Sequence, residues 1–374
     1  MPAAVLPSLD KLDPIEAWKP WQPSDKDPWG VKWAGHLYRR AGFGPTRDEV
    51  RQAVKAGLPA TLDRLLAGNP ERAQQDRGAA AEGQRIARRN NPLELRGWWI
   101  ARILANYHPL REKLTLFWHN HFATSINKVQ SVALMLRQNE LLRKYALGKF
   151  HPFLLEMSKD PAMLIWLDSN SNVKGKPNEN YAREIMELFS LGVGNYTEKD
   201  IREAARAFTG WHTDGNGFSF RKDLHDFGTK TVLGQTGELD GGDVVRILLE
   251  QPAAAKFLVR KLYRWFVSEA QTPPDSFLQP LADAYRKSDY DTAVVIRMML
   301  GSRHFFSEHA YRQRVKMPVE FVLGAVRTLG QNQVSPRALV TQLEVMGQHL
   351  FAPPNVKGWE CGTAWLNTAT VVAR

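Results

Sequence analysis

A predicted helix over residues 179–189 carries several ionisable side chains on one face. The polar members of this face are Glu179, Asn180, Arg183, Glu184 and Glu187. Steps of about 100° per residue gather them opposite an apolar face. In a polar cavity, two carboxylates beside one arginine acquire different pKa values, so one serves as general acid and the other as base. The structural alternative is a solvated face with i,i+4 ion pairs worth about 0.2–0.5 kcal/mol each.

The loop before this helix is rich in hydrogen-bonding side chains. Its polar residues are Asp168, Asn170, Asn172, Lys174 and Asn178. Because functional groups concentrate on such loops, this composition favours the cavity interpretation of the helix that follows.

Histidines supply two further candidate sites. The order His119-Asn120-His121 would suit a divalent metal on a strand, where both rings face one way. At a helix end, as predicted here, the rings diverge by about 200°, and one structural and one pocket histidine is the alternative. His225 beside Asp226 suits a general base with an orienting carboxylate. Its alternative is a turn in which Asp226 bonds its own backbone.

Cationic, amide and aromatic side chains are candidates for holding a substrate. Guanidinium and ammonium groups suit an anionic group, through bidentate or point-charge contacts. Tryptophans near paired carboxylates suit a sugar ring. The candidate substrate-binding residues are Arg39, Asn172, Asn180, Arg183, Trp211, Lys357 and Trp359.

The elements that must position these residues are predicted to be mostly α-helical. An extended arm over residues 1–32, rich in proline and tryptophan, leads into a single multi-helix globular domain over residues 33–374. Residues 68–91 are polar and poor in large apolar side chains, which indicates a mobile linker or an exposed helix.

One segment breaks the helical pattern. Residues 212–235 contain four glycines and alternate irregularly between polar and apolar side chains. Runs at 218–220 and 230–233 are typical of short strands. We therefore predict a small β-hairpin insertion that carries His225 and Asp226.

Composition narrows the class of partner. The 374 residues have a formal net charge of +11, which favours an anionic small molecule or glycan. The cations are dispersed and form no nucleic-acid-binding motif, which argues against nucleic acid as the partner.

The one cysteine, Cys361, rules out a disulfide framework. No apolar run reaches membrane-spanning length and no secretory signal pattern is present, so a cytoplasmic location is expected, or a periplasmic or envelope one if the precursor differs.

Several sequence blocks together resemble one bacterial family, the domain of unknown function numbered 1800. They are residues 36–44 (HLYRRAGFG), 117–122 (FWHNHF), 178–184 (NENYARE), 208–211 (FTGW), 225–226 (HD) and 353–359 (PPNVKGW). The resemblance implies no particular reaction and no catalytic residue. Family members are often encoded beside exported proteins similar to the alkaline-phosphatase superfamily, which implies such a protein as partner.

Two functions follow from these observations. The first is an acid/base hydrolase or lyase acting on an anionic or polyhydroxylated, glycan-like substrate. The second is a non-catalytic binding or chaperone-like partner of an acidic or alkaline-phosphatase-superfamily-like protein. The enzyme requires one pocket to gather the candidate catalytic residues, which are His119, Glu179, Glu184, Glu187, His225 and Asp226.

Overall fold

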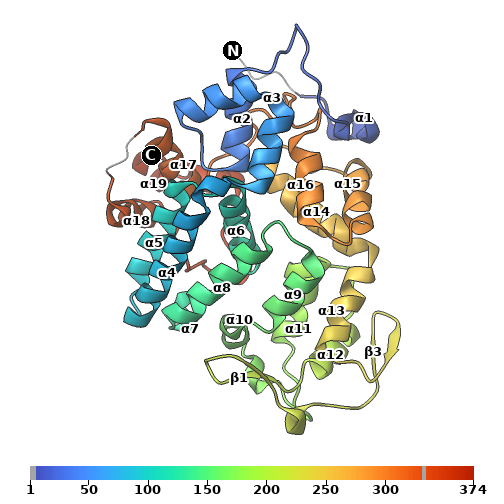
Figure 1. Ribbon diagram of the computed structural model, residues 1–374. Helices are drawn as coiled ribbons and strands as arrows, with labels where there is room; N and C mark the ends of the chain where they lie inside the picture. Colours follow the sequence, from blue (N-terminus) through green and yellow to red (C-terminus); the bar gives the residue numbers. More distant parts are fainter. Residues whose placement is uncertain (1–5, 331–333) are drawn as a thin grey trace.

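Helices follow one another along most of the computed structural model, which describes residues 6–330 and 334–374 (Figure 1). The first three are α1 (Pro14–Trp18), α2 (Val31–Ala41) and α3 (Arg47–Ala67). Thr46 and Glu49 exchange side-chain-to-backbone hydrogen bonds and so form the expected capping box of α3. The expected fold class, mostly α-helical, is confirmed.

Tryptophans hold the segment before α2 against the C-terminal half of the chain. The Trp18 Nε1 donates to the carbonyl oxygen of Phe277 at 2.8 Å. The Trp21 ring stacks on Phe306 with centroids 4.5 Å apart. These contacts bury large apolar surfaces, so the arm lies on the domain. Residues 1–5 of the predicted arm lie outside the described residues.

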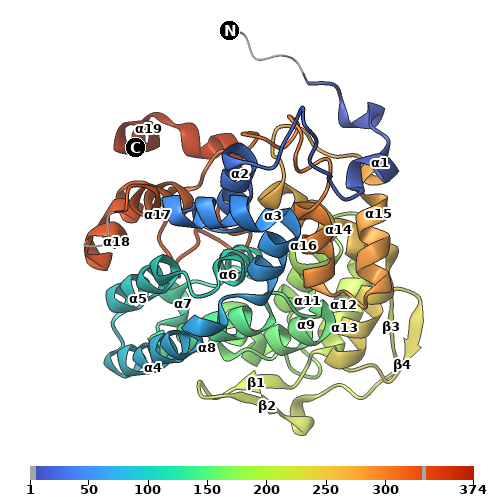
Figure 2. The same ribbon diagram turned by 45° about the horizontal axis from the view of Figure 1, so that its top comes forward.

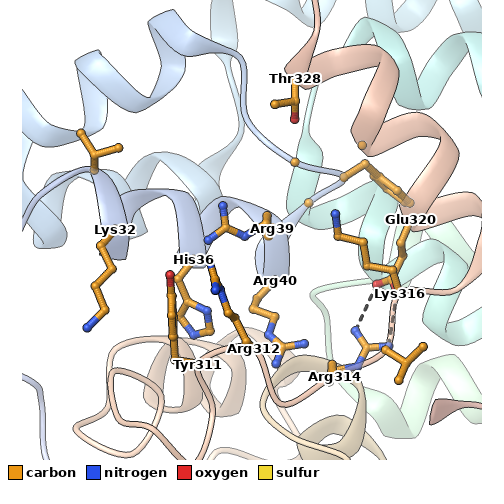
Figure 3. Close-up of a pocket in the computed structure, with 16 residues that line it drawn as sticks. Lys32, His36, Arg39, Arg40, Tyr311, Arg312, Arg314, Lys316, Glu320 and Thr328 are labelled. Carbon is orange, nitrogen blue, oxygen red and sulfur yellow. Dashed lines mark hydrogen bonds and ion pairs between the residues drawn. The ribbon is translucent and has the colours of Figure 1, made fainter. Parts of the chain in front are cut away.

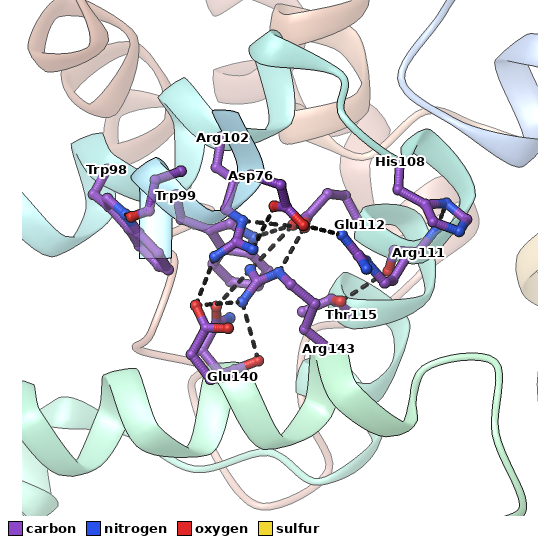
Figure 4. Close-up of polar contacts among 12 residues, drawn as sticks. Asp76, Trp98, Trp99, Arg102, His108, Arg111, Glu112, Thr115, Glu140 and Arg143 are labelled. Atoms are coloured by element: carbon purple, nitrogen blue, oxygen red, sulfur yellow. Dashed lines mark hydrogen bonds and ion pairs between the residues drawn. The ribbon is translucent and has the colours of Figure 1, made fainter. Parts of the chain in front are cut away.

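Ion pairs join four of the next five helices (Figure 4). These five are α4 (Ala73–Arg89), α5 (Pro92–Ala105), α6 (Pro109–His121), α7 (Ile126–Val129) and α8 (Val132–Tyr145). Arg102 of α5 contacts Asp76 of α4 and Glu140 of α8, each at 2.6 Å. Arg143 of α8 donates to Glu112 of α6 at 2.6 Å. Of the two alternatives for residues 68–91, the structure therefore has a helix over 73–89, held through Asp76.

The carboxylate-bearing helix differs from the prediction. The elements here are α9 (Phe150–Ser158), α10 (Pro161–Trp166), α11 (Asn180–Glu184) and α12 (Glu198–Ala207). A continuous α-helix was expected over 179–189, but α11 passes into a π-helix at Ile185–Ser190. There the Leu191 N–H donates to the Met186 carbonyl oxygen, five residues back, at 2.9 Å. The wider turn replaces the expected α-helical hydrogen bonds, but the two faces stay apart: Ile185, Met186 and Phe189 are buried, whereas Glu184 and Glu187 are partly exposed.

The predicted β-hairpin is wrong in its pairing. The strands are β1 (Trp211–Thr213), β2 (Phe218–Phe220), β3 (Lys230–Val232) and β4 (Gln235–Gly237), and they form two separate antiparallel hairpins, β1–β2 and β3–β4. Gly215 and Gly234 supply positive φ in the two connections. Each strand pairs with the neighbour reached by a short turn, because short connections cost less conformational entropy than a long loop.

The C-terminal third returns to helices. They are α13 (Gly241–Glu250), α14 (Pro252–Phe266), α15 (Asp275–Lys287), α16 (Thr292–Leu300), α17 (Pro318–Thr328), α18 (Pro336–Val345) and α19 (Thr368–Ala373). Figure 2 shows α17 beside α2, which lies near the other end of the sequence. A Cβ on Gly44 would lie 3.4 Å from Gly324 Cα, so the backbone after α2 closely approaches α17. Every described helix is too short or too polar to span a bilayer.

Candidate anion-binding site

A cavity of about 520 Å³ lies between α2, the loop that follows it and the segment before α17 (Figure 3). We call it the α2 cavity. Its cationic lining residues are Lys32, Arg39, Arg40, Arg312, Arg314 and Lys316. Among the described residues that line it, the one carboxylate is that of Glu320. The lining is therefore strongly positive.

Two simple periodicities bring these cations together. Lys32, His36 and Arg40 follow one another at i, i+4 spacing and form a stripe along α2. The opposite side of the helix, which includes Leu37, is buried in the core. From residue 312 to 316 a cation occupies every second position, and this segment crosses beneath α2.

Among the described residues, Arg314 is the one of these six cations that has an acidic partner. Within the described part of the chain, Arg39, Arg312 and Lys316 form no ion pair through their side chains. Burial lowers the pKa of Arg39, and the nearby Arg312 lowers it further. Burial and the charge of Arg39 likewise lower the pKa of Lys316. A bound anion would relieve this mutual repulsion.

The carboxylate of Glu320 is already shared between two cations. It accepts a hydrogen bond from Arg314 Nη1 at 3.0 Å and another from the buried Lys113. Burial raises the pKa of Glu320, but Arg314 and Lys113 outweigh burial and hold it well below its usual range. Its charge therefore leaves the positive excess of the cavity largely in place.

Two further groups are fixed by backbone carbonyls. Arg40 donates through Nη2 to the carbonyl oxygens of Val267 and Ala310, at 2.8 and 2.9 Å. His36 Nε2 lies 3.0 Å from the Phe305 carbonyl oxygen, which places the ring proton on Nε2. Burial lowers the pKa of His36 to about 3, with Arg40 the next cause, so the ring is neutral at neutral pH.

The carboxylates expected to act as acid and base lie elsewhere. Arg183 donates to Glu179 at 3.1 Å and pairs with the exposed Glu198 at 2.8 Å. Glu184 and Glu187 remain close together: burial raises the pKa of Glu184 and the charge of Glu187 raises it further. Lys357 lowers the same pKa, so it too lies nearby. Asn180 is exposed at the start of α11.

His119 and His121 point in different directions. His119 Nε2 accepts from the Phe351 N–H at 3.2 Å, beside the Trp359 ring. His121 Nε2 lies 3.1 Å from the Phe189 carbonyl oxygen, and its Nδ1 lies 3.0 Å from Lys261 Nζ. Both nitrogens of His121 are thus engaged. In residues 6–330 and 334–374, no group of three or more His, Cys, Asp or Glu side chains could hold a metal ion.

The remaining candidates hold loops together. Asn172 donates to the Ala205 carbonyl oxygen at 2.9 Å, and its Oδ1 accepts from the Asn178 N–H at 2.9 Å. His225 Nδ1 donates to the Thr209 carbonyl oxygen at 2.7 Å. Asp226 forms an ion pair with Arg206 at 2.8 Å. Trp211 packs on Phe208 and Phe218.

Arg39 is thus the one sequence-predicted site residue that lines the α2 cavity. The structure brings Glu184, Glu187 and Lys357 together, but places them and His225 outside this cavity. The other cations of the cavity were missed. The signal that would have found three of them is the run of cations at every second position from 312 to 316, which concentrates positive charge within five residues.

Comparisons with known proteins identify a family but no activity. A search of curated proteins and a search of solved structures each returned no match. One family model, described as a protein of unknown function (DUF1800), matches residues 36–374. The match begins at His36 of the α2 cavity and includes Arg39 and the cationic run at 312–316. The chain therefore belongs to the DUF1800 family.

Proposed function

We propose that this protein binds a small polyanionic ligand in the α2 cavity. The observation that carries the proposal is the set of three cations, Arg39, Arg312 and Lys316, that line the cavity without an acidic partner among the described residues. The cavity volume of about 520 Å³ falls within the range of about 300–1,000 Å³ that is typical of small-molecule sites.

The donors indicate the chemistry of the ligand. Guanidinium groups present paired N–H donors that match phosphate, sulfate or carboxylate oxygens, and a lysine adds a point charge. Arg40 and Arg314 already donate to protein acceptors, so they contribute positive potential from the floor. Arg39, Arg312 and Lys316 supply free donors, and Lys32, which lies over the Trp33 and Tyr311 rings, adds a further positive charge. Because these free donors come from three separate side chains, a ligand with two or more anionic groups suits the cavity best.

Catalysis in the α2 cavity has less support than binding. A general acid or base works best when its pKa lies near the working pH. The carboxylate of Glu320 is held ionised and the ring of His36 is held neutral. An acid/base hydrolase or lyase acting on a glycan-like substrate stays a prediction supported by the Glu184–Glu187 pair. An alkaline-phosphatase-superfamily-like partner also stays a prediction.

Calorimetric titration with pyrophosphate and citrate at low ionic strength tests the proposal. We expect the wild-type protein to bind at least one of these anions, and the affinity to fall with added salt. The double variant Arg39→Gln/Lys316→Gln should bind about tenfold more weakly, because two charge-assisted contacts to the anion are lost. Its thermal midpoint should stay near that of wild type, since neither side chain has an ion-pair partner.

A charge-matched control separates the cavity from net charge. The double variant Arg88→Gln/Lys222→Gln removes the same two charges from exposed positions on α4 and beside β2. We expect it to bind like wild type. Equal weakening of both double variants, or no binding of either anion by the wild-type protein, would overturn the proposal.

A further inference from the structure

The π-helix at Ile185–Ser190 turns two carbonyl groups toward neighbouring helices. The Gly192 N–H donates to the Met186 carbonyl oxygen at 3.1 Å, so it does not bond the Leu188 carbonyl four residues back. The Leu188 carbonyl oxygen instead accepts from Lys261 Nζ of α14 at 3.0 Å. The Phe189 carbonyl oxygen contacts His121 Nε2 of α6 at 3.1 Å. π-helical turns are frequent at functional sites, which makes these two contacts of interest.

The amino group of Lys261 has two acceptors and no carboxylate partner in the described part of the chain. The contact between His121 Nε2 and a carbonyl oxygen places the imidazole proton on Nε2. His121 Nδ1 therefore carries a lone pair, which accepts from Lys261 Nζ at 3.0 Å. The second acceptor is the Leu188 carbonyl oxygen.

A neutral amine fits this arrangement better than an ammonium ion. A neutral amine has two N–H groups, and the two acceptors satisfy both of them. Its lone pair then stays free for bond formation. An ammonium ion would carry a third N–H, for which no hydrogen-bond acceptor is found among the described residues.

The surroundings of Lys261 also favour the neutral amine. Burial is the largest cause of a pKa lowered to about 7, and Arg264, one turn along α14, lowers it further. Cys361 would raise this pKa only as a thiolate, and burial raises the pKa of that thiol to about 11. His121 is neutral, because burial holds its pKa well below the usual value. The Phe257 ring lies 4.9 Å from Lys261 Nζ.

We propose that Lys261 is a nucleophilic amine that captures small aldehydes as imines, independently of the α2 cavity. The lone pair of Nζ forms a bond to the carbonyl carbon, and the carbonyl π electrons move to oxygen. A proton passes from nitrogen to oxygen to give a carbinolamine. Loss of water then leaves a C=N bond to Lys261. Lys261 is partly exposed as a residue, whereas its Nζ is enclosed by the Phe257 ring, His121 and the Leu188 carbonyl, so the proposal is confined to small aldehydes.

Reductive trapping on the full-length protein tests this inference. The protein is treated with acetaldehyde and sodium cyanoborohydride between pH 6 and 9, and ethylation of each lysine is followed by peptide mass spectrometry. An ordinary lysine, with a pKa of about 10.4, is only about 0.04% free base at pH 7. We expect Lys261 to react about tenfold faster than the exposed Lys222 at pH 7. Its rate should level off above about pH 8, where the rate at Lys222 still rises.

The same reaction in guanidinium chloride is the matched control. Unfolding removes the burial and the two acceptors, so Lys261 and Lys222 should then react at similar rates. A folded protein in which Lys261 reacts no faster than Lys222 at pH 7, or does not react, would overturn the inference. Persistence of the rate ratio after unfolding would overturn it too, because the advantage would then come from local sequence.

Discussion

The side-chain amide of Asn120 pairs with the backbone of Trp359 through two hydrogen bonds. The Trp359 N–H donates to Asn120 Oδ1 at 2.6 Å, and Asn120 Nδ2 donates to the Trp359 carbonyl oxygen at 3.3 Å. The preceding Gly358 has a φ of +84°, and a Cβ there would lie 2.3 Å from Asn120 Oδ1. Two blocks that carry the family resemblance, FWHNHF and PPNVKGW, therefore meet in a structural contact at the end of α6.

Replacement of Asn120 by alanine should lower the free energy of unfolding by about 2 kcal/mol. Each lost hydrogen bond contributes about 1 kcal/mol, and the Trp359 backbone groups would lose their partners. Urea denaturation measures the change. The control Gln75→Ala removes an exposed amide from α4 and should stay within about 0.5 kcal/mol of wild type. Equal stability of the two variants would show that this contact contributes nothing.

Gly35→Ala should raise stability and weaken anion binding at the same time. A Cβ at this helical position would lie 3.0 Å from Arg39 Nη1, so the mobile guanidinium must shift. Alanine in a helix is favoured over glycine by about 0.8–1 kcal/mol. We expect a higher unfolding free energy by calorimetry, with pyrophosphate affinity reduced about threefold by the displaced cation.

The matched control for this prediction is Gly78→Ala on α4. A Cβ there meets no atom within 4 Å. It should raise stability by a similar amount and leave anion binding unchanged. If both variants bind pyrophosphate like wild type, Arg39 does not contact the ligand.

The stability that Glu112 contributes should disappear in acid. Burial raises its pKa, but Arg143 and Arg102 outweigh burial and hold the pKa at about 2. A folded-state pKa below the unfolded value gives stability that is fully present above about pH 4.3 and is lost as pH falls toward 2. Glu112→Gln should therefore cost about 3 kcal/mol at pH 7 and much less at pH 2–3. Urea unfolding at several pH values measures this, and a constant difference between the two proteins would contradict it.

His225→Phe should lower stability without changing anion binding. The variant removes the hydrogen bond from Nδ1 to the Thr209 carbonyl oxygen and keeps an aromatic ring between Phe220 and Phe227. The unsatisfied carbonyl should cost about 1–2 kcal/mol in urea denaturation. The control His151→Phe should be close to neutral, because the His151 ring forms no hydrogen bond with any of the described residues. Weaker pyrophosphate binding by the His225 variant would instead link this loop to the ligand.

Local signals in the sequence predicted the helices well. The capping residues Thr46 and Thr197 both form the expected boxes, with Glu49 and Asp200. A capping box involves residues only three apart, and an amphipathic pattern repeats every 3.6 residues, so both can be read from a short window. The π-helix at Ile185–Ser190 was not predictable in this way, because its carbonyls are bound by side chains of α6 and α14.

Contacts between distant segments decided the rest. Asp76 lies in the polar stretch for which the sequence left open a mobile linker or an exposed helix, and its pairing with Arg102 and Arg111 holds α4 in place. The pairing of the four short strands into two hairpins was likewise decided by contacts between strands. In each case the deciding energy comes from a partner outside the local window, so propensity leaves alternatives open.

The sequence alone determined a helical protein with a net charge of +11, and it placed Arg39 among the residues that suit an anion. Only the tertiary structure showed that Arg39 and Lys316 line one cavity, while Glu184, Glu187 and His225 lie apart from it. The reason is physical. Charge and helical period are properties of the chain itself, whereas an electrostatic site forms where packing of the whole core brings like charges together and leaves them without partners.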